Sequence, residues 1–425
     1  MSFRALPSGT KMTLANLTAP ACLVGKPGDL TTLDLTIENG RITGGPTDEA
    51  IDMQRAMVFP CFVDMHTHLD KGHIWPRARN PDGTFLGAIE TVGADRAANW
   101  SGNDVRTRMQ FGLECAYAHG SRAVRTHLDS IPPQDTISWP MFSELREEWA
   151  DRISLQASSL IGCDSFENIA SGYAETADLV ASHGGLLGLV TYPVPDLRKR
   201  LLDFFELAGN RELEVDLHTD ETMDGSSEAL RLIAEIVMEI GWNLPVTVGH
   251  CCSLSAQDDA RALETLDLVA DAGLHVVSLP MCNLYLQDRL SGRTPRSRGI
   301  TLVHEMKARG INVSFASDNT RDPFYAYGDL DMIEVMRQAT RIAHLDHSDN
   351  DWAHAFLGNP AHACGFDAAS LVPGAPADLV ICSARDWTEL FSRPQADRIV
   401  LRDGKPIDTS LPSYADLDHL MEAGL

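Results

Sequence analysis

Two histidines spaced two residues apart, His66 and His68, follow the apolar run 57–63. In a β-strand, residues two apart point to the same side. The spacing therefore predicts that both imidazoles face one point just beyond the end of a strand, where a metal ion could bind. A pair of this kind also arises often by chance, and a short motif alone is weak evidence. The interpretation depends on what lies further along the chain.

Five further polar residues lie at the ends of other apolar runs. Each has an ordinary structural explanation, such as a buried histidine, a helix cap or a solvated acid at a helix start. Their recurrence at separate strand ends is much harder to attribute to chance. These residues are His127, His218, Glu221, His250 and Asp318.

Eight short β-like runs alternate with helical stretches through the middle of the chain. One such stretch, 227–240, has apolar residues at helical spacing. Eight strand–helix units predict an α/β fold of the (β/α)8 TIM-barrel type, although a doubly wound sheet alternates in the same way. A barrel would bring all the strand ends into one ring. The eight runs are 61–66, 123–128, 153–158, 187–192, 213–218, 246–250, 275–279 and 313–317.

Both ends of the chain have strand and turn patterns. Asn39-Gly40 separates two short apolar runs, which is a strong hairpin signal. Residues 377–382 and 398–405 have a similar pattern. We therefore expect a small β-sandwich domain built from residues 1–58 and 366–425, and a barrel over residues 59–365.

The polar set is suited to hydrolysis at a metal ion. Imidazole and carboxylate ligands suit zinc or iron(II), and the bound ion makes hydroxide available near neutral pH. Glu221 lies three residues after His218 and can carry a proton to a leaving nitrogen. His250 can orient the hydroxide or polarise the substrate, and Asp318 can accept the proton of the water. Run 187–192 contains no lysine or acid that could bridge two ions, so we expect one divalent ion.

These residues resemble the amidohydrolase superfamily, and within it the cytosine deaminase-like branch. The superfamily pattern is His-x-His, two later histidines and a final aspartate. The resemblance implies that His66, His68, His218 and Asp318 bind the metal and that Glu221, His250 and Asp318 are catalytic. The similar motifs are His66-Thr67-His68-Leu69-Asp70, Arg125-Thr126-His127-Leu128-Asp129, His218-Thr219-Asp220-Glu221, the loop 283–289 and the loop 317–324.

Departures from the branch pattern concern the substrate. The stretch 158–162 lacks the glutamine that binds the amide edge of a pyrimidine, and Gln156 lies too early to replace it. A buried polar edge of a substrate that loses such a hydrogen-bond partner typically binds about 1–3 kcal/mol more weakly. Larger or N-substituted heterocycles are therefore possible substrates in addition to cytosine. We expect Gln287, Asn319, Phe324 and Lys71 to bind substrate, with helix packing or loop capping as the alternative for Gln287. Among the residues after the first motif, Trp75, Arg77 and Arg79 either line the mouth of the site or belong to a solvated loop.

The composition of the chain indicates which classes of binding partner and which cellular location to expect. The formal net charge of −25 disfavours binding to nucleic acids and anionic membranes. No run approaches the roughly 20 apolar residues of a membrane helix, and no signal peptide is apparent, so a cytoplasmic location is expected. The nine cysteines form no Cys-x-x-Cys pair, which indicates reduced thiols. Members of the branch are often oligomeric, so a homo-oligomer is an open alternative.

We therefore predict a hydrolytic deaminase that releases ammonia from a small N-heterocycle, such as a cytosine-like aminopyrimidine. One alternative is a hydrolase of an N-substituted aminotriazine, another amino-heterocycle or a cyclic amide on the same barrel. A second alternative is a non-catalytic barrel.

Overall fold

The computed structural model describes residues 3–7, 11–44, 50–367, 370–394 and 397–421. The chain forms two compact units. The first contains Met1–Asp64, Glu114–Ala123 and Leu330–Pro412, and the second contains Met65–Leu113, Val124–Asp329 and Ser413–Leu425.

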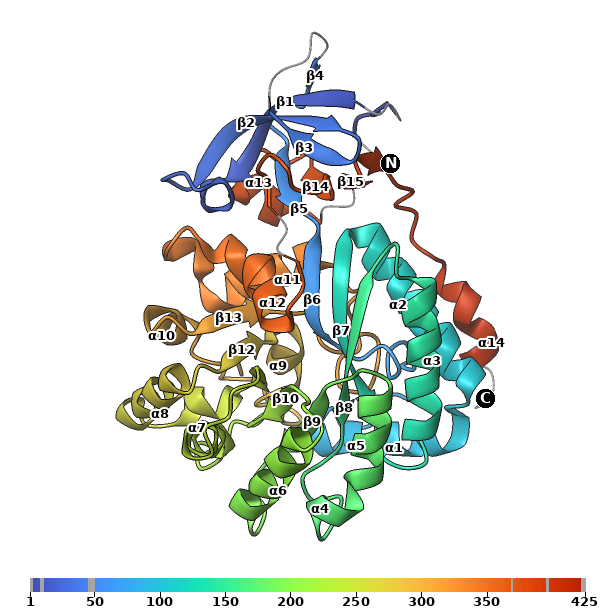
Figure 1. Ribbon diagram of the computed structural model, residues 1–425, viewed down its shortest axis with the longest axis vertical. Coiled ribbons are helices and arrows are strands. Elements are labelled where there is room, and N and C mark those ends of the chain that lie inside the picture. The colour runs from blue at the N-terminus through green and yellow to red at the C-terminus, as the bar shows by residue number, and fades with distance from the viewer. Residues whose placement is uncertain (1–2, 8–10, 45–49, 368–369, 395–396, 422–425) are drawn as a thin grey trace. The chain divides into compact units, whose positions relative to one another are not determined.

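The first unit contains a mixed sheet of strands from both ends of the chain (Figure 1). Its order is β16-β15-β14-β5-β1-β2-β3, with β4 also pairing with β1. The predicted Asn-Gly hairpin joins β2 and β3, and Asn39 and Gly40 have φ values of 49° and 77°, as a tight hairpin turn requires. The strands are β1 (Lys11–Pro20), β2 (Leu30–Glu38), β3 (Arg41–Thr43), β4 (Ala50–Asp52), β5 (Met57–Pro60), β14 (Leu379–Cys382), β15 (Arg398–Arg402) and β16 (Lys405–Pro406).

All eight strands predicted for the middle of the chain are present, with ends within two residues of those expected. They form the sheets β6-β7-β8 and β13-β12-β11-β10-β9. Parallel bridges Ser158–Leu186 and Gly162–Val190 connect the surroundings of β8 and β9, and Thr67–Asp318 connects the end of β6 with the chain after β13. The strands are β6 (Phe62–Thr67), β7 (Ser121–Asp129), β8 (Ser154–Leu160), β9 (Leu187–Thr191), β10 (Val215–Thr219), β11 (Val246–His250), β12 (His275–Ser278) and β13 (Asn312–Phe315).

Strand β6 shows why these runs are strands. All six of its residues are buried, including the polar ones, as expected for a strand covered on both faces. Apolar side chains fill the interior along the strand, so the polar side chains at its carboxyl end are held in a fixed and dry position.

Helices alternate with these strands and lie around them in Figure 1. Helix α7 confirms the predicted amphipathic stretch, because Leu230, Ile233, Ala234 and Val237 are buried on one face. Within the described part of the chain, no helix is long and apolar enough to cross a membrane. The main helices are α1 (Phe85–Asn99), α2 (Gly102–His119), α3 (Asp135–Glu148), α5 (Ala174–Ser182), α6 (Leu197–Gly209), α7 (Ala229–Glu239), α8 (Asp259–Asp271), α9 (Pro280–Leu286), α10 (Val303–Ala308), α11 (Met332–Ala343) and α12 (Gly358–Cys364), and the shorter ones are α4 (Ile169–Gly172), α13 (Trp387–Ser392) and α14 (Asp418–Met421).

Candidate metal centre and active site

Three histidines converge in the second unit. His66 ends β6, His68 follows it, and His218 lies in β10. The Nε2 atom of His218 is 3.1 Å from Nε2 of His66 and 3.3 Å from Nε2 of His68. Burial and the neighbouring imidazoles lower the pKa values of His66 and His218 well below the usual range. Neutral imidazole nitrogens that point at one another suit a shared cation.

Asp318 completes this group from the chain after β13. Its Oδ1 is 3.2 Å from Nε2 of His68 and 3.6 Å from Nε2 of His66. Both carboxylate oxygens are buried, and apart from these imidazole contacts neither has a hydrogen-bond partner among the described residues. A buried carboxylate without a cationic partner is strongly unfavourable, and a bound cation would neutralise it. The chemistry of the four side chains therefore fits a divalent metal ion.

The backbone at two of these strand ends is strained. His250 and Asp318 have φ values of 68° and 66°, a region that non-glycine residues rarely adopt. The amide nitrogen of Asp318 donates a 2.9 Å hydrogen bond to the carbonyl of His66, which helps to hold this conformation. Strain of this kind persists where the surrounding structure enforces it, and it often marks functional positions.

His127 lies against the same histidine group. Its ring centroid is 4.0 Å from that of His66, and its Nε2 is 3.8 Å from Oδ1 of Asp216. Arg125 donates a 2.9 Å hydrogen bond from Nη1 to Asp216. The sequence analysis did not single out Asp216. Its position two residues before His218, on the same face of the same strand, is the signal that could have found it.

Glu221 and His250 face each other at the edge of the histidine group. Oε1 of Glu221 is 3.4 Å from Nδ1 of His250. Asn283, on α9, contacts both: its Nδ2 is 3.3 Å from Oε1 of Glu221 and 2.9 Å from Nδ1 of His250. Burial and the nearby Asp318 raise the pKa of Glu221 well above the usual range, and burial lowers that of His250 to about 4. A carboxyl group that retains its proton beside a neutral imidazole suits proton transfer.

Two more residues near Glu221 are Cys282, which lies in α9, and Gln287, which follows the last residue of that helix. Gln287 donates a 3.2 Å hydrogen bond from Nε2 to the backbone carbonyl of Glu221. The thiol of Cys282 donates to Oδ1 of Asn319 at 3.6 Å. From the sequence, Asn283 was placed in the family-like loop 283–289 without a role, and Cys282 was missed, because nothing in their spacing indicates which way this helix turns them.

The remaining residues predicted to bind substrate lie on the loops after β6 and β13. Nζ of Lys71 is 3.0 Å from Oδ1 of Asp129 and 5.0 Å from the ring centroid of Phe324. Burial opposes the charge of Lys71, but Asp129 and other carboxylates raise its pKa overall, so the side chain is an ammonium. Nδ2 of Asn319 donates a 2.8 Å hydrogen bond to Asp322, whose other oxygen accepts the backbone amide of Phe324. All four of the residues predicted to bind substrate are buried.

Arg77 fits neither of the two positions expected from the sequence, which were the mouth of the site and a solvated loop. Arg77 neither lines a mouth nor lies in solvent, because its side chain is 3% exposed and forms ion pairs with Asp95 and Asp104. Gln156, which lies too early to hold a substrate, accepts hydrogen bonds from Nε and Nη2 of Arg125. Both polar groups are committed to internal partners that the sequence did not reveal.

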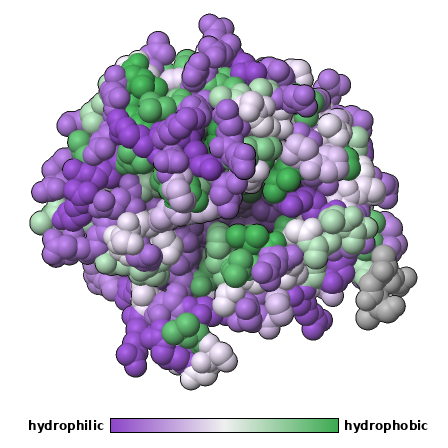
Figure 2. Space-filling model, turned by 90° about the horizontal axis from the view of Figure 1, so that it is seen from below, coloured by the Kyte–Doolittle hydropathy of each residue, from purple (hydrophilic) through white to green (hydrophobic). Residues whose placement is uncertain are grey.

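Strand β6 runs downward in Figure 1, so its carboxyl end points towards the face shown in Figure 2. Hydrophilic residues cover most of this face, and hydrophobic residues form separate patches near its middle. The strands therefore direct the histidine group towards a surface on which polar and apolar side chains are mixed.

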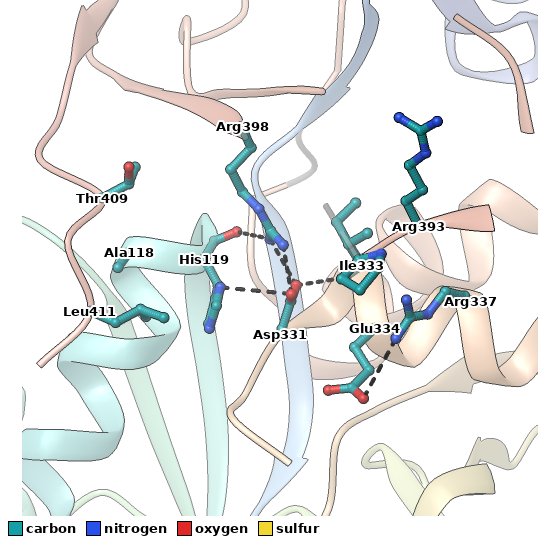
Figure 3. A pocket seen from close by; sticks show the side chains of 11 residues that line it. Ala118, His119, Asp331, Ile333, Glu334, Arg337, Arg393, Arg398, Thr409 and Leu411 are labelled. Carbon is teal, nitrogen blue, oxygen red and sulfur yellow. Dashed lines mark hydrogen bonds and ion pairs between the residues drawn. The ribbon is translucent and has the colours of Figure 1, made fainter. Parts of the chain in front are cut away.

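A separate cavity of about 390 Å³ lies within the first unit (Figure 3). Arg398 donates from Nη1 and Nη2 to the two oxygens of Asp331 at 2.8 and 2.6 Å, and Nδ1 of His119 is 3.7 Å from Asp331. None of the site residues predicted from the sequence is among the described residues that line it. Arg398 pairs with Asp331 and Arg337 pairs with Glu334 inside the unit, so we assign this cavity a structural role.

Known proteins similar to this chain include deaminases and amidohydrolases by name. The sequence model described as the amidohydrolase family matches residues 168–408. A pterin deaminase from Rhizobium rhizogenes is 50% identical over 435 residues, which cover 99% of each chain.

Two solved structures are similar along nearly the whole chain. A 5-methylcytosine deaminase from Klebsiella pneumoniae, liganded with 5-fluorocytosine, has a TM-score of 0.78 and 26% identity, covering 93% of this chain and 97% of that one. An N-isopropylammelide isopropylaminohydrolase from Burkholderia multivorans has a TM-score of 0.75 and 25% identity, covering 95% of this chain and 100% of the other.

Proposed function

Because this chain belongs to the amidohydrolase family, we propose that it hydrolyses the exocyclic amino group from the pyrimidinone ring of a pterin, releasing ammonia. The site geometry that supports a deaminase is the buried arrangement of Glu221, His250 and Asp318 beside three imidazoles. The choice of a pterin rests on the 50% identity with the Rhizobium rhizogenes enzyme. The similarity to named deaminases and hydrolases makes the chain a hydrolase of carbon–nitrogen bonds, so the non-catalytic alternative is set aside.

We propose that His66, His68, His218 and Asp318 hold one divalent cation, zinc or iron(II). This proposal is supported by the converging Nε2 atoms and by the buried carboxylate of Asp318 that faces them. Such a cation lowers the pKa of water from about 15.7 towards 7, which makes hydroxide available at neutral pH.

The proton transfers are assigned to this chain's own residues. Asp318 accepts a proton from the attacking water, and Glu221 protonates the exocyclic nitrogen as the carbon–nitrogen bond breaks. Neutral His250 receives the Asn283 amide at Nδ1, which leaves its own proton on Nε2 as a donor to the substrate. Of the two protons of water, one leaves on ammonia and the other ends on the adjacent ring nitrogen, while the water oxygen becomes the ring carbonyl.

Four buried residues are proposed to bind the ring. Phe324 supplies an aromatic surface and Lys71 supplies a positive charge next to it. Asn319 and Gln287 shape the pocket, because their amides fix the loop of Asp322 and the backbone of Glu221.

The test is a screen of the purified protein for ammonia release from pterin, cytosine and amino- or alkylamino-triazines. We expect kcat/KM for pterin to exceed that for cytosine by more than about tenfold, since each 1.4 kcal/mol of transition-state binding gives this ratio. Turnover of cytosine or a triazine with none of pterin would contradict the substrate assignment.

A second candidate function is hydrolysis of an N-substituted aminotriazine. The observation that favours it is the similarity to the Burkholderia multivorans N-isopropylammelide enzyme over 95% of the chain. In the same screen this alternative predicts release of an alkylamine instead of ammonia.

We also propose that the eight strands from β6 to β13 close into a (β/α)8 barrel over residues 59–365. The parallel bridges at both edges of the two sheets support closure. The proposed small domain, residues 1–58 and 366–425, would fold its mixed sheet into a β-sandwich. The homo-oligomer and the cytoplasmic location stay predictions.

A further inference from the structure

We infer that Glu221, Cys282 and Asp318 form a second cation site, selective for thiophilic divalent ions such as zinc or cadmium, whose occupation inhibits the enzyme. One ligand atom from each residue lies within 4.8 Å of the others, and all come from chain segments that follow different strands. This ligand set shares only Asp318 with the proposed catalytic centre. The inhibitory part of the inference rests on the proposed role of Glu221, whereas binding of the second ion does not.

The second carboxylate oxygen of Asp318 is the sign that a ligand is missing here. The residue is 1% exposed and its Oδ1 lies 3.2 Å from Nε2 of His68, whereas its Oδ2 has no hydrogen-bond partner among the described residues. A carboxylate has two oxygens and can bridge two ions, as in two-metal sites. One oxygen of Asp318 can therefore face the histidine group while the other faces Glu221 and Cys282.

Cys282 determines which ions the site accepts. It is fully buried, and its sulfur lies 3.6 Å from Oδ1 of Asn319. A thiolate ligand favours zinc and cadmium, whereas magnesium and calcium prefer all-oxygen sites. On binding, the cation displaces the thiol proton, which passes to the buffer, and a sulfur–metal bond replaces the sulfur–hydrogen bond.

Inhibition follows from the position of Glu221. Oε1 of this residue already contacts Asn283 and His250. A carboxylate that coordinates a cation cannot also carry a proton to the substrate. The second ion would therefore stop turnover without removing the first. We expect it to bind more weakly than the first ion, because it shares Asp318 with a cation already bound and must displace the proton of Cys282.

The experiment adds cadmium to the holoenzyme loaded with its first metal ion. We expect a thiolate-to-cadmium charge-transfer band in the ultraviolet, one additional cadmium per chain in equilibrium dialysis, and loss of activity that mild chelation reverses. In Cys282→Ser and Cys282→Ala the band should be lost and the second binding weakened at least about tenfold, with the first ion retained. Cys163→Ser is the matched control, because Cys163 is also buried but its sulfur contacts the carbonyl of Tyr192 instead.

Two results would overturn the inference. One is the absence of a cadmium band in the natural protein, and the other is a band of equal strength in both Cys282 variants while Cys163→Ser lacks it. Magnesium should neither produce inhibition nor compete with cadmium. If the band and the extra equivalent appear but no pterin is deaminated, the second site stands and the proposed function fails, so the two failures are distinguishable.

Discussion

Asn283 provides the sharpest test of the active-site geometry, because a single amide group contacts two residues with proposed catalytic roles. Its Nδ2 is 3.3 Å from Oε1 of Glu221 and 2.9 Å from Nδ1 of His250. In Asn283→Ala both hydrogen bonds are lost, and the two side chains are free to turn. The first metal ion should be retained, because Asn283 contacts none of its proposed ligands in these interactions.

The size of the effect follows from the types of hydrogen bond. A neutral bond contributes about 1 kcal/mol and one to a charged group about 1.5–3 kcal/mol. Glu221 becomes charged as it gives up its proton, so one of the two bonds is to a charged group at the transition state. A loss of about 2–4 kcal/mol there would lower kcat/KM roughly 30- to 900-fold, since 1.36 kcal/mol corresponds to a factor of ten. We expect most of the loss in kcat, because Asn283 orients Glu221 and His250 and is not proposed to bind the substrate.

Asn283→Asp separates two arrangements of the proton on His250. If Asn283 donates to Nδ1, an aspartate cannot replace it and adds a negative charge next to Glu221. This variant should therefore be less active than Asn283→Ala. The assay is steady-state ammonia release together with metal analysis. An aspartate variant more active than the alanine variant would show that Nδ1 of His250 is the donor, which refutes our assignment.

A matched control exists at the start of β13. Nδ2 of Asn312 is 3.1 Å from Nδ1 of His275, at the opposite end of the strands from the histidine group. Asn312→Ala removes an asparagine–histidine contact of the same kind. We expect it to change stability slightly and kcat/KM by less than about twofold, as is usual for a substitution away from the site.

Three further predictions follow. Asp318→Ala should abolish turnover and weaken metal retention, and activity within about tenfold of the natural protein would contradict its role as a ligand. Glu221→Gln should keep its metal content but lose most activity, because an amide cannot carry the proton, and full activity would remove Glu221 from the mechanism. Burial alone would raise the pKa of Asp331, but Arg398 outweighs it and holds the pKa well below its usual range, so the carboxylate stabilises the folded state above pH ~4 and loses this effect as the pH falls. Asp331→Asn should therefore lower the free energy of unfolding by roughly 3 kcal/mol at pH 7 and by clearly less near pH 3 in urea titrations, and a difference independent of pH would be inconsistent with this ion pair.

The strands could be predicted because their patterns are local. Each of the eight runs is a short segment rich in apolar residues between polar turns, and β11 begins and ends at the residues expected from the sequence. The Asn39-Gly40 hairpin and the buried face of α7 were predicted for the same reason, because their sequence patterns are also local. The predicted run 61–66 begins within one residue of β6, but β5 was not predicted as a separate strand. Residues 57–63 form one apolar run, and β5 is distinguished from β6 by its pairing with β14 in a different sheet.

The site could be predicted where chemistry and strand ends coincide, and not where a contact depends on long-range packing. His66 and His68 were identified from their spacing, and His218 and Asp318 from their positions at the ends of predicted strands; the structure brings the four together. The roles of these residues stay predictions until a metal is measured. Asn283, Cys282 and Asp216 were missed because each acquires its contact from a segment at least 33 residues away. Arg77 was misjudged for a similar reason, since its acidic partners lie on the helices that follow its loop.

The left-handed backbone at His250 and Asp318 has a consequence for how this sequence changes over generations. Each such position costs about 1 kcal/mol or more of folding free energy, which is a noticeable fraction of a marginal total. Natural selection for catalysis must therefore oppose substitutions at these positions that would raise the folding stability of the chain. In a lineage that no longer needs the reaction, these two positions should be among the first to accept glycine or asparagine, and an inactive descendant should tolerate heat better than its ancestor.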